Sequence, residues 1–206
     1  MPTKGQPTRA ELTALVASFA LITAWSAVNP ADPLTWWLEA LPAMVIIALL
    51  LGAQRLFPVT RVTQWLVWAL CVMMVIGAHY TYSGVPPFGW LRDTFDLSRN
   101  HYDRMSHIMQ GITVAMVARE LALRFTPIRP GLPLLILITG ATLGVSAGCE
   151  LVEWAAAEIF GGGAIEFLGM QGDGWDAQKD MSLALLGALS AQLLLRSRQN
   201  KALGIT

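Results

Sequence analysis

The 206-residue chain is 54% hydrophobic and 14% charged, and its formal net charge is zero. Soluble domains carry roughly 25% charged residues, so this composition indicates a membrane protein. The scattered basic residues form no cationic face, which excludes nucleic acid as a partner. Residues 1–206 are expected to form a single all-α domain, a polytopic membrane helix bundle without a separate soluble module.

Six apolar segments are each long enough to cross a bilayer, which takes about 20 mainly apolar residues. The fourth is the least hydrophobic, so it is expected to face neighbouring helices more than lipid. The predicted spans are residues 11–28, 38–57, 62–82, 101–124, 132–160 and 177–196.

The basic residues predict the orientation of these spans. If the N-terminus is cytoplasmic, ten of the 14 Lys and Arg residues fall on the cytoplasmic side. Cytoplasmic loops of membrane proteins are enriched in Lys and Arg, so both termini are predicted to be cytoplasmic in a bacterial inner membrane. The four basic residues on the outer side are Arg92, Arg99, Arg104 and Lys179.

Ionisable residues inside the predicted spans gather toward the outer surface. Charged side chains in hydrocarbon are costly and usually face a bundle interior, where they carry function. Asp103 and His107 are four residues apart and share a helix face, which Gln110 continues. Glu150 and Glu153 share a face of the fifth span. At a rise of about 1.5 Å per residue, both sets lie in the outer half of the membrane.

Further acidic residues surround the start of the sixth span. Asp176 and Asp180 are four residues apart there, and a glycine-rich stretch, residues 161–176, precedes them. Irregular backbone at membrane depth is tolerated where protein surrounds it, so this stretch is a candidate re-entrant loop between the fifth and sixth helices. Such a loop would bring further candidates to the site: Gln171, Asp173 and Trp175.

Simpler interpretations exist for two of the acidic residues. Asp is a favoured N-cap, so Asp176 is also suited to capping the sixth helix. Asp103 is close in sequence to Arg99 and Arg104 and can pair with either of them. Both alternatives remain open at this point.

Two other patterns are expected to be structural. Gly140, Gly144 and Gly148 form a small-xxx-small ridge on the fifth span, a pattern that lets another helix approach closely. Glu120 and Arg124 are four residues apart at the cytoplasmic end of the fourth span, so they are expected to form an ion pair on the helix surface, outside the site.

A divalent cation could be bound by the acidic residues of the predicted site together with His107. Glu150 and Glu153 cannot both stay ionised in a dry site without a shared proton, a distant Arg or a bound cation. Asp and Glu with one His suit Mg²⁺, Mn²⁺, Fe²⁺ or Zn²⁺. No motif specifies the metal, so the inference rests on residue type alone. The predicted ligands are His107, Glu150, Glu153, Asp176 and Asp180.

Several of these residues lie in segments that resemble a known family. HYDRMSHIMQG, CELVEW and FLGMQGDGWDAQKDM are similar to the YjdF-type family of bacterial inner-membrane proteins, over residues 45–198. The resemblance implies a six-helix inner-membrane protein and supplies no reaction. A looser resemblance links the acid and His, the Glu pair and the spaced Asp residues to VanZ-type proteins, which are linked to glycopeptide resistance, although Glu153 stands where that family would have Gln.

Two functions fit the predicted site. The first is a metal-assisted or acid/base enzyme at the outer leaflet, acting on a lipid or a lipid-linked headgroup, with Glu150, Glu153 and Asp103 as catalytic residues. The second is a transporter or ion-binding protein in which the same carboxylates bind a cation or relay protons. A transporter requires a polar path across both halves of the bundle, whereas the inner half offers little beyond Arg119 and Glu120, so the enzyme is preferred.

Overall fold

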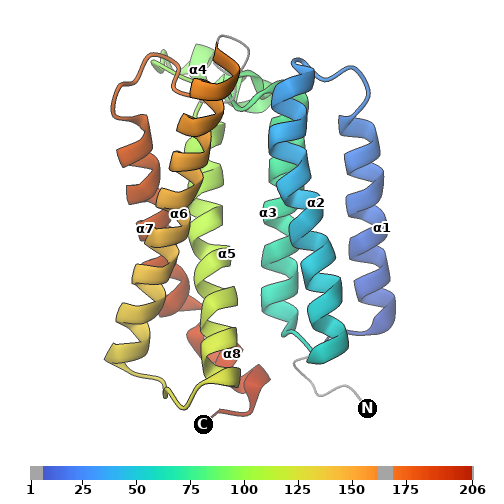
Figure 1. The fold of residues 1–206 in the computed structure, drawn as a ribbon, viewed down its shortest axis with the longest axis vertical. Helices are drawn as coiled ribbons and strands as arrows, with labels where there is room; N and C mark the ends of the chain where they lie inside the picture. The colour runs from blue at the N-terminus through green and yellow to red at the C-terminus, as the bar shows by residue number, and fades with distance from the viewer. Residues whose placement is uncertain (1–6, 162–168, 206) are drawn as a thin grey trace.

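The computed structural model describes residues 7–161 and 169–205, and in them the chain forms eight α helices and a short 3-10 helix, with no strand. Six long helices alternate in direction along the long axis of the molecule (Figure 1). The helices are α1 (Arg9–Ser26), α2 (Pro33–Leu56), α3 (Arg61–Tyr80), η1 (Tyr82–Gly84), α4 (Pro86–Thr94), α5 (Tyr102–Phe125), α6 (Leu132–Phe160), α7 (Asp176–Leu194) and α8 (Arg196–Leu203).

The all-helical fold is confirmed for the described residues, and each predicted span falls on one long helix. By length and composition, α2, α3 and α6 are long and apolar enough to cross a membrane. The hydropathy pattern does not predict α4 and α8. Figure 1 shows α4 at one end of the bundle and α8 at the other, the end at which α1 starts.

Local sequence explains where the first three helices begin. The side chains of Thr8, Asp32 and Thr60 each accept a hydrogen bond from the backbone N–H three residues later. Such N-caps satisfy backbone donors that the helix leaves free. Proline in the first turn of α2 and of α6 starts those helices without losing a hydrogen bond.

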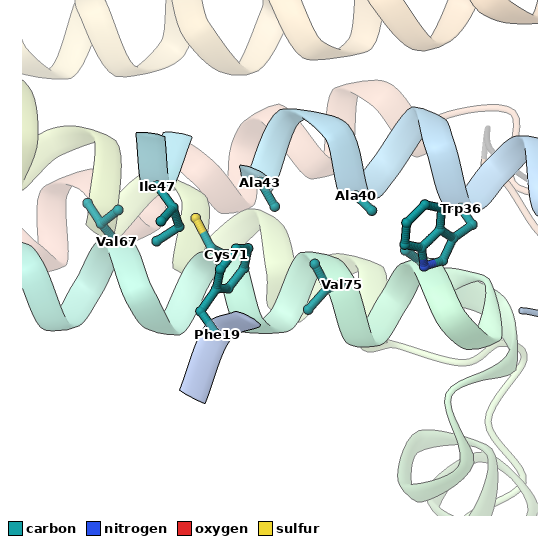
Figure 2. Packing of buried hydrophobic residues seen from close by; sticks show 9 residues of the cluster. Phe19, Trp36, Ala40, Ala43, Ile47, Val67, Cys71 and Val75 are labelled. Atoms are coloured by element: carbon teal, nitrogen blue, oxygen red, sulfur yellow. The ribbon is translucent and has the colours of Figure 1, made fainter. Parts of the chain in front are cut away.

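The first half of the molecule is a three-helix unit with an apolar core. Figure 2 shows one face of α2 against α3, with Phe19 of α1 inserted beside Cys71. Ala40 and Ala43 are fully buried at this contact, and their small side chains let α2 approach α3 closely. The labelled α2 residues recur every three or four positions, as one helix face requires: Trp36, Ala40, Ala43 and Ile47.

In the second half, two glycines let α5 and α7 pack backbone to backbone. A Cβ atom added at Gly111 of α5 would overlap the carbonyl of Ala184, and one added at Gly187 of α7 would overlap the carbonyl of Ile108. Helices approach this closely only where both lack side chains at the crossing. The crossing fixes α5 and α7 relative to each other where Ile108 and Gly111 meet Ala184 and Gly187.

No described helix packs closely against the glycine ridge expected on the fifth span. A Cβ atom added at Gly140, Gly144 or Gly148 of α6 would meet no atom of the described residues within 4 Å. The small-xxx-small spacing is therefore present without the packing that it predicts. The neighbour that α5 contacts most closely is α7, at glycines separated by 76 positions in the numbering of the chain.

The Glu120 carboxylate is buried and does not lie on the helix surface. Its side chain is only 2% exposed, and it accepts hydrogen bonds from the hydroxyls of Thr60 (2.7 Å) and Thr63 (2.6 Å) as well as pairing with Arg124 at 2.8 Å. The expected ion pair with Arg124 is present, but its placement on the surface is wrong. Glu120 links α5 to the N-terminus of α3.

Candidate functional site

A cavity of about 390 Å³ lies between α2, α3, α5 and α6. Its rim includes Val145 and Val152 of α6, which are exposed, so the cavity opens on the side of the bundle between α2 and α6. Its inner wall carries most of the polar residues. These are Glu39, Asp103, Ser106, His107, Gln110 and Glu153.

His107 is at the centre of the polar wall. Its Nε2 atom lies 3.5 Å from Oδ1 of Asp103 and 3.8 Å from Oε1 of Glu150. Asp103 and His107 share a face because they are one turn apart on α5, and Glu150 reaches them from α6. The geometry brings together residues from two helices, α5 and α6.

Two groups of side chains around His107 have the spacing of metal ligands. Ligand atoms of Asp103, His107 and Asp180 lie within 4.8 Å of one another, and so do those of His107, Glu150 and Glu153. Zinc and similar ions bind N and O atoms at about 2.0–2.2 Å, so two ligand atoms of one ion lie at most about 4.4 Å apart, which is comparable to the 4.8 Å limit here. Each group therefore fits a single divalent cation.

Several polar atoms in this cluster have no partner among the described residues. Nδ1 of His107, Oε1 of Glu150 and Oδ1 of Asp180 are buried and make no hydrogen bond, and neither does Oε1 of Gln110. Buried polar atoms are almost always hydrogen-bonded, so such a concentration of free ones needs an explanation. A bound cation or a polar ligand would satisfy them.

Arg99 holds the outer edge of the cluster. Its buried guanidinium donates hydrogen bonds to both carboxylate oxygens of Asp176, to Oδ2 of Asp103 (3.3 Å) and to the carbonyl of Gly169 (3.0 Å). Asp103 therefore pairs with Arg99, which is one of the alternatives that the sequence leaves open. Asp176 makes no N-cap, because Trp175 occupies that position of α7. Its carboxylate pairs with Arg99 and belongs to neither ligand group.

The rest of the glycine-rich stretch lies at the surface end of the site. Asp173 accepts hydrogen bonds from Lys179 (2.6 Å), Arg104 (2.7 Å) and the backbone N–H of Trp175. The hydrogen bond from Lys179, followed by that from the Trp175 backbone, lowers the pKa of the Asp173 carboxyl. Trp175 itself is 68% exposed and does not line the cavity.

Gln171 has a positioning role. Its side-chain amide donates to the carbonyl of Asn100 and accepts from the backbone N–H of the same residue, both at 2.9 Å. This pair of bonds fixes the segment that precedes α7 against the start of α5. Residues 162–168 of the predicted re-entrant loop, 161–176, lie outside the described residues.

Comparison with known proteins decides the family. A sequence profile described as "Predicted membrane protein (DUF2238)" matches residues 11–201. The chain belongs to the DUF2238 family. It is also 38% identical over 178 residues to "Inner membrane protein YjdF" of Escherichia coli (strain K12), a match that covers 86% of this chain and 85% of that protein. No solved structure matches the chain.

These findings confirm the resemblance to YjdF-type proteins that the sequence motifs indicate. The DUF2238 match also extends the likeness beyond residues 45–198, into the first predicted span. The chain is an integral inner-membrane protein, and its surroundings are a lipid bilayer.

The sequence patterns do not predict two features of the site in this DUF2238 chain. Glu39 of α2 lines the cavity, with the phenol of Tyr82 in hydrogen-bonding reach of its carboxylate. It is the single ionisable residue in the apolar part of α2 before Arg55, and an isolated acid in a span is a signal of function. The pairing of Arg99 with Asp103 is an alternative that the sequence indicates, but its pairing with Asp176, which is remote in sequence, is not.

Proposed function

We propose that the protein is an enzyme that acts at the outer leaflet of the inner membrane on a lipid or a lipid-linked headgroup. The proposal includes six membrane spans, α1, α2, α3, α5, α6 and α7, with both termini in the cytoplasm. Support comes from the alternating direction of these helices and from the position of α8 at the end where α1 starts (Figure 1). The excess of basic residues at that end favours a cytoplasmic location.

This orientation assigns the candidate site to the outer half of the membrane. Asp103 and His107 are in the first two turns of α5, and Asp180 is in the second turn of α7. Both helices start at the end of the bundle opposite α8 (Figure 1). A site at that depth suits the headgroup region of the outer leaflet.

The single observation that carries the enzymatic proposal is the set of free buried ligand atoms around His107. We infer that His107 holds a divalent cation, either with Asp103 and Asp180 or with Glu150 and Glu153. Such a cation polarises a phosphoryl or carbonyl oxygen and activates water. The carboxylates that do not bind the cation are then available as general acid or base.

The walls of the cavity support a lipid as the substrate. Its lateral opening is lined by apolar side chains of α2, α3 and α6, among them Ile46, Met74 and Val145. An apolar entrance that ends at acidic groups suits a molecule with a hydrocarbon tail and a polar headgroup. A water-soluble substrate would gain nothing from an opening that faces lipid.

Metal analysis tests the cation site directly. The protein is purified in detergent, stripped with a chelator and then titrated with Zn²⁺ or Mn²⁺. Wild type is expected to bind the ion with an affinity at least tenfold higher than that of Asp180→Asn or Glu150→Gln. Asp93→Asn is the matched control because Asp93 is an exposed acid on α4, away from the cavity. Equal affinity in all four proteins, or no binding by folded wild type, would rule out the cation site.

Turnover of lipid tests the reaction. The protein is reconstituted with a bacterial polar lipid extract, and the lipids are compared by mass spectrometry with those incubated with Glu150→Gln. A change in lipid composition that depends on Glu150 supports the enzyme. An unchanged lipid profile contradicts it.

The second candidate function is a transporter that uses the same carboxylates. An apolar core below the cavity argues against it, because Ala115 and Met116 of α5 are fully buried there against α6 and α7. Uptake of cations or protons by proteoliposomes that Glu150→Gln abolishes would favour the transporter.

A further inference from the structure

A second cavity lies at the end of the bundle that carries α8, away from the candidate active site. Its volume is about 950 Å³, and residues of α5, α6, α7 and α8 line it. Arg119, Arg196 and Lys201 contribute three positive charges to its wall, and no acidic residue is among the described residues that line it. The cavity is therefore electropositive.

Arg119 provides the most specific feature of this cavity. The side chain is buried, and its guanidinium donates hydrogen bonds to Oε1 of Gln199 (2.7 Å) and Oδ1 of Asn200 (2.6 Å), both neutral acceptors. No described carboxylate lies within ion-pair distance of it. A buried charge without a partner of opposite charge is costly, so an external anion would stabilise it.

The other buried arginine of the bundle shows the contrast. Arg99 is as buried as Arg119, yet it pairs with Asp103 and Asp176. Arg124, at the same end as Arg119, pairs with Glu120. Among these arginines, Arg119 alone has only amide partners in the described structure.

The amide partners hold Arg119 in place. Nε2 of Gln199 donates to the carbonyl of Met116 (2.8 Å) and to the hydroxyl of Thr63 (3.3 Å). Because its nitrogen is used there, the oxygen of Gln199 is directed to Arg119. The guanidinium is thus oriented before any ligand binds, which lowers the entropic cost of binding.

The remaining wall of the cavity is apolar. Leu132 and Leu135 of α6 and Ile205 at the end of the chain contribute to it, and Leu132 is 68% exposed. Hydrocarbon beside three cations fits a ligand with an anionic group and an attached chain. Arg and Lys side chains bind phosphate with charge-assisted hydrogen bonds.

We propose that this cavity binds a phosphate group with net negative charge, as carried by an anionic phospholipid headgroup or by free phosphate. Basic pockets between membrane helices on the cytoplasmic side are suited to such headgroups. This site is separate from the His107 cluster. The inference stands whether or not the proposed enzymatic function is correct.

Binding of defined probes tests the inference. Delipidated protein in a nonionic detergent is titrated with dihexanoyl-phosphatidylglycerol, dihexanoyl-phosphatidylcholine and inorganic phosphate. Phosphatidylglycerol is expected to bind, and the Arg196→Gln/Lys201→Gln double variant is expected to bind it about 25-fold more weakly, at about fivefold for each charge near an anionic headgroup. Both residues are exposed, so the double variant is expected to fold.

Arg198→Gln is the matched control, because Arg198 is an exposed cation on the same helix that does not line the cavity. Its affinity for phosphatidylglycerol is expected to equal that of wild type. Competition by inorganic phosphate would identify free phosphate as a ligand, whereas binding of phosphatidylglycerol without such competition identifies the lipid. Equal binding of phosphatidylcholine, or an unchanged affinity in the double variant, would overturn the proposal.

Discussion

The Arg99 guanidinium donates hydrogen bonds to both carboxylate oxygens of Asp176, a residue 77 positions further along the chain. The pair joins the segment before α5 to the first turn of α7. Both side chains are almost fully buried, with 3% and 5% of their surface exposed. An ion pair in this position holds together the end of the bundle that carries α4.

Loss of the Arg99 charge is expected to destabilise the protein strongly. Arg99→Gln leaves the carboxylates of Asp176 and Asp103 buried without their cation, which costs about 3–5 kcal/mol of unfolding free energy. Denaturation in mixed detergent micelles measures this quantity. Arg92→Gln, which removes an exposed pair with Asp93, is expected to cost about 1 kcal/mol or less. Similar losses in the two variants would contradict the assigned role of Arg99.

The glycine crossing between α5 and α7 predicts that replacing glycine by alanine has opposite effects on stability at two positions. Gly187→Ala introduces a methyl group into the backbone of α5, so it is expected to cost about 1–3 kcal/mol. Gly140→Ala adds the same atoms where no neighbour lies within 4 Å, and the better helix propensity of Ala is worth up to about 1 kcal/mol.

The comparison uses thermal unfolding in detergent, with wild type as the reference. A loss of stability in Gly187→Ala together with no loss in Gly140→Ala supports the crossing. If Gly140→Ala is the more damaging variant, then α6 and not α7 makes the close helix contact.

The Asp173 carboxyl predicts a dependence of stability on pH. Its pKa is lowered in the folded state, chiefly by the hydrogen bond from Lys179, so the carboxylate stabilises the fold at pH values above about 4, the ordinary pKa of Asp. That contribution is lost as the pH falls through the lowered pKa. Wild type is therefore expected to lose more stability between pH 5 and pH 3 than Asp173→Asn does. Parallel profiles of stability against pH in the two proteins would contradict this prediction.

Hydropathy and turn counting predict much of this structure. The six long helices follow the apolar segments, because a run of apolar residues this long has no other way to satisfy its backbone in lipid. The approach of His107, Glu150 and Asp180 also follows from the sequence, since each lies a known number of turns from the same end of the bundle. Whether they bind a metal stays a prediction.

Helix neighbours are not predictable in the same way. Gly140, Gly144 and Gly148 have the spacing of a packing ridge, but the close contact is at Gly111 and Gly187, each a single glycine with an alanine four residues later. Glycine spacing on one helix does not specify which helix is beside it. The partner of Arg99 and the burial of Glu120 depend on this same pairing of distant helices, so composition and spacing do not reveal them.

The separation between Arg99 and Asp176 also has a consequence for biosynthesis. If α5 spans the membrane as proposed, Arg99 and Asp103 reach it long before their partners Asp176 and Asp180 have been synthesised. In a nascent chain that ends before Asp176, α5 is therefore expected to stay accessible to a water-soluble probe. Protection of α5 from the probe in that truncated chain would mean that α5 enters the bilayer on its own.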